Sequence, residues 1–179
     1  MTEAAAFTAW LGAAIIVLSD GRRGLALGLG LIALAFATLA WAGGDIPAAA
    51  ALFAGGAVAS VQRLRSGIDG WGLMPPGSTS RLILVIVAGF LALWIAASVT
   101  TGAGAPLRFA TLAVLGLMGA RVLEGRDPAV VLTAVGGMAL ALAMAAGLTL
   151  TPPGLAPYVA AALITVGVSV LRVSEPHAT

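Results

Sequence analysis

The sequence contains no cysteine and no lysine, and only 9% of its 179 residues are charged. Without cysteine, the chain can form no disulfide, no thiol nucleophile and no cysteine-ligated metal site. Soluble domains carry about 25% charged residues, so this chain is unusually poor in charge. Hydrophobic residues make up 60% of it, and no water-soluble fold of this length could bury so much apolar surface. The chain is therefore predicted to lie largely in lipid.

Residues that carry chemistry are equally scarce. Ionisable side chains inside membrane spans are costly and usually functional, but the centres of the apolar segments contain none. The single histidine, His177, lies near the end of the sequence and cannot supply the pair of axial ligands that a b-type haem needs. No metalloprotease, hydrolase or phosphate-binding motif is present. These absences predict a protein that is not an enzyme and that holds no cofactor or metal.

Arginine supplies all nine basic side chains. The arginines stand singly or in pairs between apolar runs, whereas a nucleic-acid-binding surface gathers its basic residues on one face. The sequence therefore predicts no nucleic-acid partner. It predicts the lipid bilayer as the main surroundings of the chain.

Charges, prolines and glycine pairs divide the chain into seven apolar segments. Each approaches the ~20 residues that a helix needs to cross a hydrocarbon core, and none alternates polar and apolar residues as the strands of a membrane barrel do. The predicted fold is an all-α, polytopic helical membrane protein with a single membrane domain over residues 1–179. The segments are residues 4–19, 25–42, 46–62, 82–99, 106–122, 128–148 and 156–171.

A recurring pattern predicts how these helices pair. Three segments begin with proline and end on arginine 15 or 16 positions later. Proline suits the first turn of a helix, and arginine complements the negative end of the helix dipole. With the segment before each, they form hairpins over about 25–65, 82–123 and 128–172, preceded by the single span 4–19. Both a true internal duplication and the ordinary pattern of short-looped membrane helices would produce this repeat.

The arginines also predict the orientation. With seven spans, eight of the nine arginines fall on one side together with the loop 66–81, and only Arg108 falls on the other. Arginine excess marks the cytoplasmic side. We therefore expect a multi-pass protein of a bacterial-type inner membrane, with its N-terminus outside and its C-terminus in the cytoplasm. Trp41, Trp94 and Tyr158 fall at the outer ends of their segments, where an interfacial aromatic belt would lie.

The first segment leaves one alternative open. If residues 4–19 lie on the membrane surface, the chain has six spans and a cytoplasmic N-terminus.

The arginines that close the three repeats are the candidate site residues. Arg63, Arg121 and Arg172 either anchor helix ends at the lipid headgroups or contact a partner's carboxylate or a substrate anion through the forked guanidinium. For Arg121, we expect Glu124 and Asp127 to hold the side chain in place.

Small residues predict close helix packing. Three pairs of small residues are spaced four positions apart, which lets helices approach closely, either inside the bundle or at a partner subunit. The pairs are Gly24 with Gly28, Gly55 with Ala59, and Gly116 with Ala120.

Residues 25–150 resemble the small membrane subunit of tripartite tricarboxylate transporters. The resemblance lies in the turn "GGDIP", the helix end "RLRSG" and the later stretches "TTGAGAP", "RVLEGRDP" and "LTLTPPG". Segments 4–19 and 156–171 would be additions to the plan of that family. The resemblance implies a helical membrane subunit, and no catalytic residue can be carried over from it.

Two functions are compatible with these observations. The first is a non-enzymatic accessory subunit of a larger membrane transport complex, whose partner holds the charged machinery. The alternative is a self-sufficient, oligomeric transporter or channel for a small neutral solute, lined by glycines such as Gly136 and Gly137 at broken helices.

Overall fold

Seven α-helices and one isolated β-bridge make up the regular structure of the described residues in the computed structural model. The structure describes residues 1–66, 69–73, 79–99, 104–125, 127–149 and 154–171. Each predicted apolar segment corresponds to one helix. In chain order the helices are α1 (Thr2–Leu18), α2 (Arg22–Ala42), α3 (Ile46–Arg65), α4 (Thr79–Val99), α5 (Ala105–Glu124), α6 (Pro128–Ala146) and α7 (Ala156–Val170).

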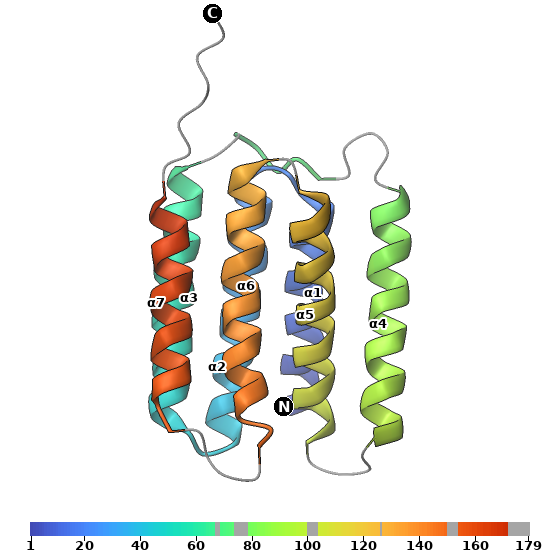
Figure 1. Cartoon of the computed structure of the whole chain (residues 1–179), viewed down its shortest axis with the longest axis vertical. Coiled ribbons are helices and arrows are strands. Elements are labelled where there is room, and N and C mark those ends of the chain that lie inside the picture. Colours follow the sequence, from blue (N-terminus) through green and yellow to red (C-terminus); the bar gives the residue numbers. More distant parts are fainter. Residues whose placement is uncertain (67–68, 74–78, 100–103, 126, 150–153, 172–179) are drawn as a thin grey trace, which may run out of the picture.

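The helices form two layers and one flanking helix (Figure 1). Helices α1, α2 and α3 make one layer, and α5, α6 and α7 make the other. Across the layers α1 packs on α5, α2 on α6 and α3 on α7, while α4 packs mainly on α5 at the edge. Because four chain reversals separate the members of each such pair, the two partners run in the same direction.

This arrangement does not single out the three predicted hairpins. Helix α2 packs on both α1 and α3, and α6 packs on both α5 and α7. Each layer is therefore a continuous up-down-up unit of three helices.

Local sequence explains where several helices begin. The Asp45 carboxylate accepts a hydrogen bond from the Ala48 amide at 3.0 Å, and the Asp127 carboxylate accepts one from the Ala129 amide at 2.8 Å. Both aspartates satisfy an amide that the helix itself leaves unpaired. Proline follows in the first turn of α3 and α6, and α5 and α7 also begin with proline. The predicted role of proline is confirmed in α3, α5 and α7, and Pro128 has the same place in α6.

Glycine sets the distance between helices inside the bundle. A Cβ added to Gly28 would lie 2.6 Å from the Gly12 carbonyl oxygen, and one added to Gly55 would lie 2.5 Å from the Ala162 Cβ. These two positions therefore pack within the bundle. Gly116 differs, because a Cβ there would meet no atom within 4 Å.

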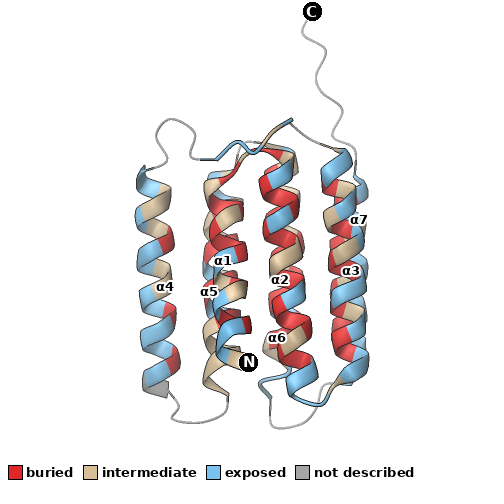
Figure 2. Ribbon diagram, turned by 180° about the vertical axis from the view of Figure 1, so that it is seen from behind, coloured by how far each residue is buried: buried red, intermediate tan, exposed pale blue. Residues whose placement is uncertain are grey.

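Four of the helices are long and apolar enough to cross a membrane, namely α2, α4, α5 and α6. Helices α1 and α7 are shorter apolar helices, and α3 is not among the four. Burial differs sharply among them: 61% of the most apolar stretch of α2 is buried, but only 17% of that of α4. Figure 2 shows the same contrast, with α4 mostly exposed at one edge.

The predicted aromatic belt is only partly present. Trp41 and Trp94 are 70% and 68% exposed, as residues at a membrane interface would be. Tyr158 is buried, and a Cβ on Gly147 would lie 2.9 Å from its hydroxyl oxygen. Tyr158 therefore lacks the exposed side chain expected of a belt residue, because it is buried in the bundle with its hydroxyl close to the residue that follows α6.

Candidate functional site

Every charged side chain that the structure describes lies in a connection or in the first or last turn of a helix. One end of the bundle, at the top of Figure 1, gathers most of the arginines, and we call it the arginine-rich end. The opposite end, called the Asp45 end, carries Glu3, Asp45 and Arg108. The arginines of the arginine-rich end are Arg22, Arg23, Arg63, Arg65, Arg81 and Arg121.

Four side chains form an ionic cluster at the arginine-rich end, which we call the Asp20 cluster. The guanidinium of Arg121 is buried and forms an ion pair with the Asp20 carboxylate. The same carboxylate accepts a hydrogen bond from Arg81 Nη1 at 3.2 Å. Arg81 Nε in turn donates to Glu124 Oε1 at 3.1 Å. The cluster joins the turn between α1 and α2 to the start of α4 and the end of α5.

The partners of Arg121 differ from those predicted. Asp20 holds its guanidinium, whereas Glu124 pairs with Arg81 and Asp127 caps α6. The prediction that Glu124 and Asp127 hold Arg121 is therefore wrong. The reason is that the side chain points into the bundle, toward a turn 101 residues earlier in the chain.

Residues 69–73 lie across the turn between α1 and α2. The Asp20 amide donates to the Gly72 carbonyl oxygen at 3.0 Å, and the Ser19 hydroxyl donates to the Trp71 carbonyl oxygen at 2.6 Å. Arg121 Nη2 also donates to the Ser19 carbonyl oxygen, at 3.3 Å. Ser19 is fully buried beneath this segment, and the Trp71 side chain is about half exposed. The Asp20 cluster and these backbone contacts fix the segment on the bundle.

Arg63 has a similar structural role elsewhere at the arginine-rich end, where α3 lies beside α7. Its side chain is buried, and Nη2 donates to the Val168 carbonyl oxygen at 3.0 Å. The contact fastens the end of α3 to α7. Its Nε has no hydrogen-bond partner among the described residues.

The three predicted site residues thus do not form one site. Arg63 and Arg121 lie in the last turns of different helices and bind different elements, and Arg172 lies outside the described residues, as does His177. Both Arg63 and Arg121 are only 2% exposed. They cannot reach lipid headgroups, so the expected headgroup anchoring does not apply to these two side chains.

The contacts that the structure describes at the arginine-rich end are ion pairs and hydrogen bonds. Within the described ranges, no group of three or more acidic, histidine or cysteine side chains is placed to hold a metal ion. The charges of the Asp20 cluster are directed at one another. Sequence inspection found Arg121 and Arg63 through the repeat, but it missed Asp20 and Arg81 because nothing in the local pattern pairs positions so far apart.

The chain matches no family model, no curated protein and no solved structure in the comparisons made. The resemblance to the small membrane subunit of tripartite tricarboxylate transporters therefore stays a prediction from the sequence.

Proposed function

We propose that the chain is a small, non-enzymatic membrane subunit that packs against a larger protein in a membrane transport complex. The observation that carries this proposal is a surface on α5 that small residues leave open. Gly116 is exposed, and a Cβ on Gly116 or Gly119 would meet no atom within 4 Å. The other two small-residue pairs contain glycines that are packed inside the bundle.

The open positions share one face of α5 with two leucines. Leu112 is 38% exposed and Leu123 is 90% exposed, and their spacing of three or four residues from the glycines places them on the same side of the helix. We call this surface, formed by Leu112, Gly116, Gly119, Ala120 and Leu123, the α5 outer face. Small residues on such a face allow a second membrane helix to approach the backbone closely, which is how membrane helices associate without a hydrophobic driving force.

The distribution of charge supports an accessory role. The members of the Asp20 cluster neutralise one another at one end of the bundle. The charged groups that move an ion or a carboxylate through a membrane would then belong to the larger subunit.

We further propose that all seven helices span the inner membrane, with the arginine-rich end in the cytoplasm and the N-terminus outside. Helix α1 supports the first span, because Ala9, Ala13 and Ile16 are fully buried against its neighbours. A helix lying on the membrane surface would not bury this face inside the bundle.

The structure weakens the alternative of a self-sufficient transporter lined by Gly136 and Gly137. Helix α6 is continuous through both glycines, and both are buried. A Cβ on Gly136 would lie 3.2 Å from Thr165 Cγ2, and one on Gly137 would lie 3.1 Å from Met118 Sδ. The expected broken helix is absent at these glycines, which serve close packing.

Photo-crosslinking from the α5 outer face tests the proposal. A photoreactive amino acid at position 112 is expected to capture one larger membrane protein in intact cells, identifiable by mass spectrometry. The matched control is the same group at Leu163 of α7, which is 68% exposed and lies on a different helix. Capture of a second copy of this chain would favour the oligomeric alternative, and capture of lipid alone would overturn both.

Two matched glycine substitutions, one on α5 and one on α7, make the test specific. Gly116→Leu is expected to abolish the crosslink and the co-purification of the captured protein, because the added side chain keeps the partner helix away. Gly167→Leu on α7 is the control, since a Cβ at Gly167 also meets no atom within 4 Å. Both variants should fold normally. Equal retention of the partner by both variants would contradict the assignment of the α5 outer face.

A further inference from the structure

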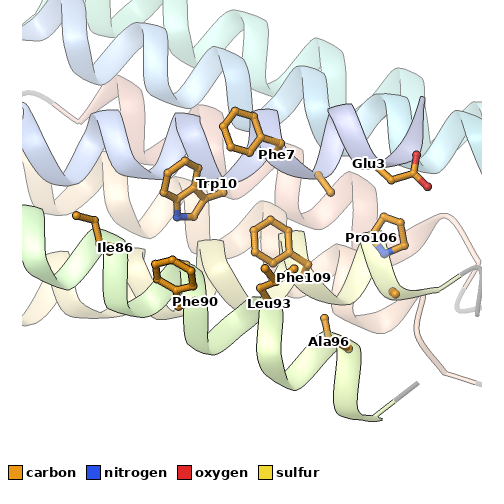
Figure 3. A pocket seen from close by; sticks show the side chains of 13 residues that line it. Glu3, Phe7, Trp10, Ile86, Phe90, Leu93, Ala96, Pro106 and Phe109 are labelled. Carbon is orange, nitrogen blue, oxygen red and sulfur yellow. The ribbon is translucent and has the colours of Figure 1, made fainter. Parts of the chain in front are cut away.

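An apolar groove lies between α1, α4 and α5. Its volume is about 650 Å³, within the range of ~300–1,000 Å³ typical of small-molecule sites. Figure 3 shows Phe7 and Trp10 of α1 on one side of the groove, with Phe90 of α4 drawn below Trp10 and Phe109 of α5 below Phe7. Among the described residues, Glu3 is the one charged residue in the lining.

Trp10 and Gly89 determine where the groove ends inside the bundle. A Cβ on Gly89 would lie 2.7 Å from Trp10 Nε1, so the indole rests directly on the backbone of α4. The same nitrogen donates a hydrogen bond to the Val85 carbonyl oxygen at 3.4 Å. On the Asp45 side of this contact the groove continues between the helices, where its lining includes Glu3, Leu93 and Pro106.

The length of the groove matches one leaflet of a bilayer. Its lining on α4 runs from Ile86 to Ala97, which is about 17 Å along a helix that rises ~1.5 Å per residue. Half of a typical hydrocarbon core is about 15 Å. The groove therefore extends from headgroup depth, at Glu3 and Pro106, to about the bilayer midplane at Trp10.

Charge at the mouth of the groove indicates the type of lipid. Glu3 lines the groove at this end. Arg108 is outside the groove lining, but it lies in the first turn of α5 beside the lining residue Phe109, and its guanidinium lies against Gly104 at the same end. One negative and one positive side chain at headgroup depth complement the amine and the phosphate of a zwitterionic headgroup.

We propose that this groove binds one acyl chain of a zwitterionic phospholipid from the leaflet at the Asp45 end. The chain lies along Phe90 and Leu93 and ends against the Trp10 indole, and the phosphate lies beside Arg108. The proposal requires that the protein lies in a bilayer, but not that it has a partner subunit. Its failure would therefore leave the assignment of the α5 outer face untouched.

Quenching of Trp10 fluorescence by brominated phosphatidylcholine tests the proposal on the detergent-purified chain. Trp41, Trp71 and Trp94 are replaced by phenylalanine so that Trp10 is the one fluorophore. Quenching is expected to saturate as lipid is added. A second chain that keeps only Trp94, which is 68% exposed and outside the groove lining, should show quenching that rises without saturation. Identical, non-saturating curves for both tryptophans would show ordinary bulk lipid and overturn the proposal.

Two variants locate the binding site. Ala97→Phe fills the groove and is expected to raise the lipid concentration for half-quenching of Trp10 by at least about tenfold. Ala54→Phe is the control, because Ala54 is exposed on α3 and outside the lining. Arg108→Gln should raise the same concentration several-fold by removing the phosphate contact. Helix content by circular dichroism confirms that each variant folds, and unchanged quenching in folded Ala97→Phe would refute the site.

Discussion

At the scale of single residues, Arg121 shows how a buried cation can join distant parts of a helical bundle. Its guanidinium is removed from water, and it contacts both the Asp20 carboxylate and the Ser19 carbonyl oxygen. Removing one partner of a buried ion pair lowers stability far more than removing one partner of an exposed ion pair. The remaining buried charge is then left without compensation. Arg81 lessens that cost here, since it also contacts Asp20.

Arg121→Ala should lower the free energy of unfolding by about 3 kcal/mol. Arg121→Lys should recover only part of this loss, because Arg121 Nη2 makes both contacts and a lysine ammonium ends one bond short of that position. The measurement is equilibrium unfolding in mixed detergent micelles.

Arg65→Ala is the control for this prediction. Arg65 also stands in the last turn of a helix, but its side chain is exposed, so the change should stay within about 0.5 kcal/mol. Equal, small effects at Arg121 and Arg65 would contradict the structural role given to Arg121.

The sequence could indicate Arg63 and Arg121 but not their contacts. Their position at the ends of proline-initiated helices follows from local rules of helix capping and dipoles. The direction in which each side chain points depends on which helix lies beside it. That neighbour is determined by contacts between residues more than 100 positions apart in the chain. A single sequence contains no signal for such pairs.

At the scale of helices, the packing depends on which glycines face a neighbour. Gly55 of α3 lies against Ala162 of α7, where a Cβ would come within 2.7 Å of the Ala162 Cα. Relief of that contact would require α3 and α7 to separate. Gly167, on the same helix as Ala162, has open space around it. The same residue type therefore has opposite consequences at the two positions.

Gly55→Ala should destabilise the protein by about 1–3 kcal/mol, the usual cost of forcing extra volume into a packed contact. Gly167→Ala should be neutral or stabilising by up to about 1 kcal/mol, because alanine favours the helix more than glycine does. Thermal unfolding of the two purified variants in the same detergent gives the comparison. A higher Tm for Gly55→Ala than for Gly167→Ala would refute the assigned packing.

Helix positions were predictable because their signals are local. Aspartate, proline and glycine mark the ends of several helices, and long apolar runs mark their middles. The order in which the helices pack was not predictable in this way. The three hairpins inferred from the repeat use only contacts between neighbours in the chain, whereas the structure adds contacts across two layers.

At the scale of the whole molecule, α4 gives the bundle its two parallel layers. A unit of three helices starts at one end and finishes at the other, so a second unit joined directly to it would run in the opposite direction. The single helix α4 returns the chain to the starting end, and α5, α6 and α7 then repeat the directions of α1, α2 and α3 (Figure 1). The arginine-rich end of one layer thereby lies beside that of the other.

Single-cysteine labelling should place the two ends of the bundle on opposite sides of the membrane. The chain contains no cysteine, so Gly43→Cys and Arg65→Cys each introduce one reactive thiol at an exposed position. In intact cells, a membrane-impermeant maleimide is expected to label position 43 and not position 65, because arginine-rich segments stay in the cytoplasm.

Permeabilised cells provide the control, in which both positions should react. Labelling of both positions in intact cells would contradict the seven-span topology.

The ion pair between Asp20 and Arg121 also has a consequence for biosynthesis. Its two residues are 101 positions apart, and at translation rates of ~5–20 residues per second the ribosome needs roughly 5–20 s to proceed from one to the other. During that interval α1, α2 and α3 are synthesised, but the Asp20 carboxylate has neither Arg81 nor Arg121 available at first. The turn that carries it must stay hydrated until α4 and then α5 emerge, so the arrival of α5, the first helix of the second layer, completes the burial of this turn.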